Sequence, residues 1–96
     1  MEIQNGTYLN VDGIFLKIDA KSGYWVALYP TTQDETVDGQ YVGVWTNPET
    51  GVTDYDRSVF IAYHDDAIAI AKAHNQLAIW DNTNQTEIWL ADVANW

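Results

Sequence analysis

The run His64-Asp65-Asp66 is the most suggestive group of metal-ligating residue types in the sequence. Imidazole and carboxylate groups are common metal ligands, but a metal site requires ligands that converge on one point. Neighbouring side chains at the start of a helix diverge, and His74 would lie turns away on a different helix face. The pattern therefore favours aspartates that cap a helix and a histidine near its C-terminal end. We expect no metal ion and no cofactor.

Paired carboxylates for acid–base catalysis would have to come from Glu49, Asp54 and Asp56. Such a pair needs a cleft with two different environments that separate the two pKa values. The sequence indicates no cleft here, and alternation along a strand would put Asp54 and Asp56 on one face, in water. The aspartates between positions 54 and 66 lack the spacing and glycine of a calcium-binding loop. Neither serine lies in a nucleophile motif, so we expect no enzymatic activity.

The charge balance is the strongest global feature of these 96 residues. Fourteen acidic residues face four basic ones, which gives a formal net charge of −10. A polyanion disfavours direct contact with nucleic acid or an anionic membrane and favours a basic partner. There is no cysteine, and the start, residues 1–6, has neither the charge nor the apolar run of a signal peptide. No stretch approaches the roughly 20 apolar residues that span a bilayer.

Turn chemistry and alternation predict short strands along the first half. Residues 7–11 and 14–18 flank Asp12-Gly13, a pair typical of a two-residue hairpin turn, and Ile14, Leu16 and Ile18 would share one face. Residues 24–29 predict an inner strand that Pro30 ends. Residues 41–45 and 52–55 flank the turn at 47–51, and residues 58–63 form a further strand.

The spacing of apolar residues changes after Tyr63 from a strand-like to a helical period. The alanine-rich segment there predicts a helix over about 66–74, packed through Ile68 and Ala71. Asp65 or Asp66 would be its N-cap, and Asn75 suits a left-handed C-terminal position. Two strands follow, at 77–80 and 86–90. We therefore predict a single α+β domain over 1–96. It would contain a mainly antiparallel sheet of six to eight short strands, with one helix packed on one face.

Part of the second half resembles a family of small uncharacterised proteins encoded by bacteriophages and bacteria. The resemblance covers roughly residues 41–90 and rests on Val44-Trp45-Thr46, Glu49-Thr50-Gly51, residues 67–72, residues 75–81 and Glu87-Ile88. It implies an origin in a phage or a bacterium and a location in the bacterial cytoplasm. The family carries no assigned activity that could be transferred.

Aromatic residues make up 14% of the chain, and five of them are tryptophan. Most tryptophans should lie in the core, but the total exceeds what one small core needs, so some aromatics should be exposed. Exposed aromatics beside carboxylates are typical of a surface that binds a basic protein.

We therefore expect a non-enzymatic protein that binds and blocks a basic, nucleic-acid-binding surface of a host defence or transcription complex. The acidic candidates are Asp34, Glu35, Asp38, Glu49, Asp54, Asp56, Asp65 and Asp66, and the aromatic anchors are Tyr41, Trp45 and Tyr55. The sequence favours the 54–66 cluster as the contact. The alternative is a module that binds a small molecule, with its pocket between protomers of a homodimer or larger oligomer. A structural virion component is a third class.

Overall fold

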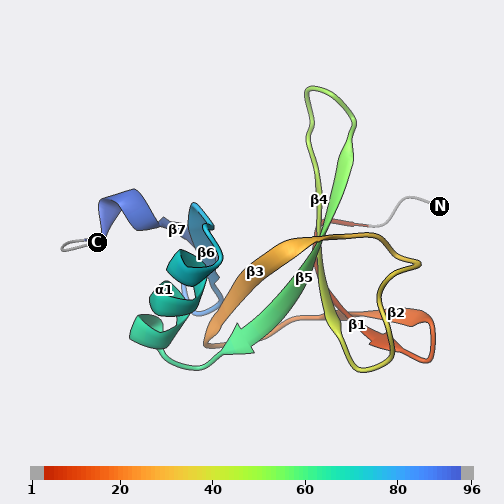
Figure 1. Cartoon of the computed structure of the whole chain (residues 1–96), viewed down its shortest axis with the longest axis horizontal. Coiled ribbons are helices and arrows are strands. Elements are labelled where there is room, and N and C mark those ends of the chain that lie inside the picture. The colour runs from red at the N-terminus through yellow and green to blue at the C-terminus, as the bar shows by residue number, and fades with distance from the viewer. Residues whose placement is uncertain (1–3, 94–96) are drawn as a thin grey trace. The chain divides into compact units, whose positions relative to one another are not determined.

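The computed structural model describes residues 4–93 and confirms an α+β fold with one helix and seven antiparallel strands (Figure 1). The sheet order is β2-β1-β4-β5-β3-β6-β7. The elements are β1 (Gly6–Val11), β2 (Ile14–Ile18), β3 (Tyr24–Thr31), β4 (Tyr41–Thr46), β5 (Thr53–Ile61), α1 (His64–Ala73), β6 (Ala78–Asp81), β7 (Thr86–Trp89) and a 3-10 turn, η1 (Leu90–Asp92).

The chain divides into two compact units, and each unit is built from two separate stretches of sequence. Unit 1 contains residues 1–19 and 29–58, and unit 2 contains residues 20–28 and 59–96. Strands β3 and β5 contribute residues to both units.

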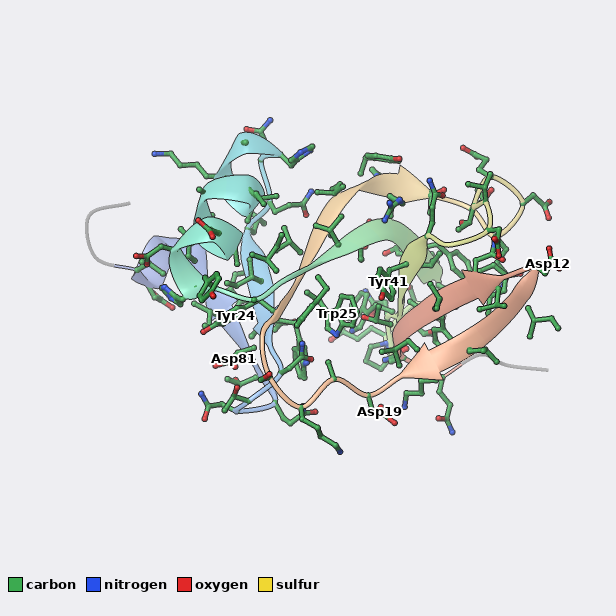
Figure 2. All side chains as sticks on the ribbon, turned by 90° about the horizontal axis from the view of Figure 1, so that it is seen from below. Asp12, Asp19, Tyr24, Trp25, Tyr41 and Asp81 are labelled. Carbon is green, nitrogen blue, oxygen red and sulfur yellow. The ribbon has the colours of Figure 1, made fainter. Side chains whose placement is uncertain are left out.

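Unit 1 is organised by the β1–β2 hairpin, which turns at Asp12-Gly13 as predicted (Figure 2). Both turn residues have positive φ, 53° and 85°, as a type I′ turn requires. The Asp12 N–H donates to a carboxylate oxygen of Asp38 at 2.7 Å, and the Gly13 N–H donates to Asn10 Oδ1 at 2.8 Å. A small core of Tyr8, Val42 and Val44 lies under the hairpin, with Phe15 and Tyr55 packed against it.

Unit 2 is organised by α1, whose buried side chains Ala67, Ile68 and Ala71 pack with Val26 and Ile79. This confirms the predicted contact through Ile68 and Ala71.

The C-terminal end of α1 is closed by a left-handed residue at the predicted position. Asn75 has a φ of 56°. Its N–H donates to Lys72 O at 3.1 Å, and the Gln76 N–H donates to Ala71 O at 2.9 Å. These are the two hydrogen bonds of a Schellman motif, which satisfies the last carbonyl groups of the helix.

The predicted start of the helix is wrong. The helix begins at His64, and its N-cap is Tyr63, which forms no side-chain capping bond. Asp65 and Asp66 are not caps but lie within the first turn, where their charge complements the helix dipole.

Two strand boundaries are also wrong. The segments 52–55 and 58–63 form a single strand, β5, because Asp56 and Arg57 continue the ladder opposite Gly43 and Val42. Pro30 does not end β3, which continues to Thr31. Pro30 is exposed, and proline interrupts a strand only where its missing N–H is needed for pairing.

Candidate protein-binding site

The β4–β5 register places an exposed aromatic residue beside two carboxylates in unit 1. Trp45 lies directly opposite Asp54, and Gly43 lies opposite Asp56. Because side chains alternate along a strand, Trp45, Asp54 and Asp56 project from the same face of the sheet. We call this face the acidic face. Trp45 is 49% exposed, and the predicted sharing of one face by the two aspartates is confirmed.

The opposite face carries both basic residues of unit 1. Lys17 lies opposite Tyr8, and Arg57 lies opposite Val42, in the row of side chains that contains the core of the unit. Arg57 also donates to the carbonyl oxygen of Ser58. Unit 1 contains nine of the fourteen acidic residues and only these two basic ones. The positive charge of the unit is therefore kept away from Trp45 and the two aspartates.

The negative charge of Asp54 acts on its neighbour Asp56. The pKa of Asp56 is raised, first by its partial burial and second by the negative charge of Asp54. Within residues 4–93, neither carboxylate forms an ion pair or a side-chain hydrogen bond. A cation placed here would favour the charged form of Asp56 and so oppose the rise of its pKa.

An open depression adjoins the same carboxylates. It has a volume of about 610 Å³ and lies within unit 1, lined by Pro30, Thr31, Thr32, Thr53, Asp54, Tyr55 and Asp56. Ligand pockets usually enclose most of the surface of the ligand. This depression is open to solvent and has two carboxylates in its lining, so it suits the charged end of a lysine or arginine side chain.

Two residues of the acidic loop between β3 and β4 form hydrogen bonds with nearby groups. Asp38 accepts the hydrogen bond from the β1–β2 turn, and Glu35 is held through its N–H and carboxylate by the hydroxyl of Thr32. Asp34 is exposed. Glu49 is exposed at the β4–β5 turn, where its N–H donates to Asn47 Oδ1. Of these carboxylates, those of Asp38 and Glu35 are therefore engaged in local hydrogen bonds.

Two further predicted site residues, Tyr55 and Tyr41, project from different faces of the sheet. Tyr55 projects from the face opposite Asp54 and Asp56 and packs against the core of unit 1. Alternation along β5 was sufficient to show this. Tyr41 shares the acidic face but is only partly exposed. Asp65 and Asp66 belong to unit 2 and lie in the first turn of α1.

Unit 2 exposes two tryptophans that the sequence did not single out. Trp80 is 36% exposed and Trp89 is 49% exposed, whereas Trp25 is buried. The expectation that most tryptophans are core is therefore wrong for the described residues, and Trp96 lies outside them. Ile79 faces Ile88 across the β6–β7 pair, so the tryptophans beside them in sequence point to the other face. The alternation of side chains along these two strands could have predicted this exposure from the sequence.

The histidine–aspartate group of unit 2 forms local contacts. His64 Nδ1 lies 3.1 Å from Asp65 Oδ1, and its ring stacks edge-on against Tyr24, with centroids 5.7 Å apart. Buried Asp81 accepts hydrogen bonds from the N–H of Thr83 and from the N–H and Nδ2 of Asn84. These bonds, led by the Asn84 side chain, lower the pKa of Asp81. Within residues 4–93, no three histidine or carboxylate side chains gather as a metal site would require.

Comparisons with known proteins gave no match for this chain. No family model matches it, and no curated protein or solved structure is significantly similar. Among the described residues, no helix is long and apolar enough to cross a bilayer.

Proposed function

We propose that this protein binds a basic surface of another protein through the acidic face of unit 1 and thereby excludes nucleic acid from that surface. The observation that carries the proposal is the separation of charge within unit 1. Trp45, Asp54 and Asp56 share one face, and Lys17 and Arg57 lie on the other. Carboxylates that lack an ion pair can take up lysine or arginine in place of phosphate groups.

Trp45 adds an aromatic surface for stacking, which the charged groups alone do not provide. Exposed tryptophan is enriched among residues that dominate binding energy, and an arginine guanidinium can stack on the indole while it pairs with a neighbouring carboxylate. Trp45 and Asp54 are directly opposite each other on adjacent strands, so one cation can contact both. The resemblance of residues 41–90 to small phage and bacterial proteins makes bacterial defence and transcription complexes the targets of this proposal.

The test uses a labelled arginine- and lysine-rich peptide of about ten residues, whose binding is followed between about 50 and 200 mM salt. The wild-type protein should bind it, and affinity should fall steeply as salt rises. The variant Asp54→Asn/Asp56→Asn should bind at least about tenfold more weakly. The matched control is Asp19→Asn/Asp92→Asn, which removes the same charge from two other exposed positions. If both variants lose affinity equally, only net charge matters and the proposed site is wrong.

A second pair of variants tests the aromatic anchor. Trp45→Ala should act mainly by raising the dissociation rate, as expected for a buried anchor in a complex. Trp89→Ala is the control, since both tryptophans are 49% exposed. Finally, wild-type protein should release a labelled DNA duplex from the peptide, and the Asp54→Asn/Asp56→Asn variant should not. Release by both would contradict occlusion through the acidic face.

A further inference from the structure

Strand β2 is the outermost strand at one end of the sheet. Backbone N–H and C=O groups on its outer edge point away from β1. The two-residue turn at Asp12-Gly13 makes Val11 and Ile14 a hydrogen-bonded pair. Hydrogen-bonded and non-bonded pairs alternate in an antiparallel ladder, so the N–H and C=O groups of Phe15 and Lys17 point away from β1. The hydrogen bonds of Asn10, the β1 residue opposite Phe15, support this assignment. The N–H and C=O groups of Asn10 bond to residues 39–40 and not to β2.

The side chains of β2 leave this edge accessible and apolar. Ile14 is 63% exposed and Leu16 is 49% exposed, and both project from the same face as Val11, which is 40% exposed. Edge strands are commonly protected by an outward charge, and Lys17 is the only charged residue of β2. Its Cε lies 3.0 Å from the position that a Cβ on Gly6 would occupy, so Lys17 folds back over β1.

We propose that β2 pairs with β2 of a second copy of this chain, antiparallel and centred on Leu16, and so forms a homodimer through a continuous sheet. In this register Leu16 lies opposite Leu16 of the second copy, and Ile14 lies opposite Ile18. Phe15 lies opposite Lys17, so the outward N–H and C=O groups of each meet those of the other. The exposed aliphatic side chains of both copies then cover one another on one face.

The sequence of β2 is self-complementary in this register. Its one charge, Lys17, faces an aromatic ring rather than a second lysine, so no like charges are directly opposed within the strand. The two-fold axis is perpendicular to the sheet, so the pairing is closed and cannot extend into a filament. The same axis presents both acidic faces on one side of the dimer. This inference does not depend on the proposed function, because it uses β2 rather than Trp45, Asp54 and Asp56.

The first experiment measures the mass of the full chain by sedimentation from about 1 µM to about 1 mM, the range of modest affinities. The mass should rise from 10.9 kDa towards twice that value. Leu16→Lys brings two lysines face to face and should raise the dimer dissociation constant at least about tenfold. Leu77→Lys is the matched control, since Leu77 is 74% exposed but lies outside β2, and it should dimerise as the wild type does.

The second experiment tests the pairing itself. Lys17→Pro removes an N–H that points outward, so it should fold normally and yet lose the dimer, because proline is tolerated at an edge but cannot donate. Hydrogen exchange of the Phe15 and Lys17 amides should slow as the protein is concentrated. A single-chain mass at every concentration would overturn the inference. A dimer that survives both Leu16→Lys and Lys17→Pro, or that protects other amides instead, would also overturn it.

Discussion

Gly23 should be intolerant of a side chain for two separable reasons. Its φ is 76°, a left-handed conformation that costs an alanine about 1–2 kcal/mol. The Phe60 ring also occupies the space that a Cβ would take, and this ring packs on Trp25 with centroids 5.5 Å apart. Displacing Phe60 forfeits an aromatic contact of about 0.5–1.5 kcal/mol. We therefore expect Gly23→Ala to lower the free energy of unfolding by about 2–3 kcal/mol.

Gly51→Ala isolates the backbone contribution. Gly51 has a φ of 74°, and no atom lies within 4 Å of the position that a Cβ would take there. Urea denaturation should give a loss of about 1–2 kcal/mol for Gly51→Ala and a larger loss for Gly23→Ala. In a Phe60→Ala background, Gly23→Ala should cost no more than Gly51→Ala does. Equal losses at the two glycines in the wild-type background would refute the steric part of the reasoning.

Three further experiments test the core, the helix end and the carboxylate pair. Ile68→Ala should cost about 2–5 kcal/mol of unfolding free energy because the side chain is fully buried, whereas exposed Ile14→Ala should cost under about 0.5 kcal/mol; similar losses in urea denaturation would argue against this core. Asn75→Ala should cost about 1 kcal/mol at its positive φ, and Asn75→Gly should cost nothing, which thermal unfolding can compare. The raised pKa of Asp56 means that the folded protein loses stability as pH rises from the unfolded value of 3.8 through the folded pKa. Asp56→Asn should therefore raise the melting temperature at pH 7, with a difference that vanishes near pH 3. A destabilised variant at pH 7 would contradict this electrostatic account.

Local chemistry accounts for the parts of the fold that the sequence predicted well. The Asp12-Gly13 turn, the left-handed Asn75 and the burial of Ile68 each depend on a few neighbouring residues or on helical periodicity. The continuity of β5 through Asp56 and Arg57 could not be predicted in this way. It depends on pairing with β4, and hydrophobicity along β5 does not reveal that ladder.

The candidate site was only partly predictable for the same reason. Alternation alone puts Asp54 and Asp56 together and Tyr55 on the other side. To predict that Trp45 lies opposite Asp54, one must also know the register of β4 and β5 across the 47–51 turn. The separation of Lys17 from the acidic face requires the order of β2, β1 and β4, which no local pattern in the sequence encodes.

The interleaving of the two units has a consequence for synthesis on the ribosome. All residues of unit 1 have been made once Ser58 is added, but Val26 of unit 2 must wait for its core partners Ile68 and Ile79. At about 5–20 residues per second, the interval from Ser58 to Ile79 lasts about 1–4 s. During that time residues 20–28 are already synthesised and their apolar side chains lack the partners that bury them. A slow codon between these two points would prolong this exposure, so codon usage over residues 59–79 should affect the yield of folded protein.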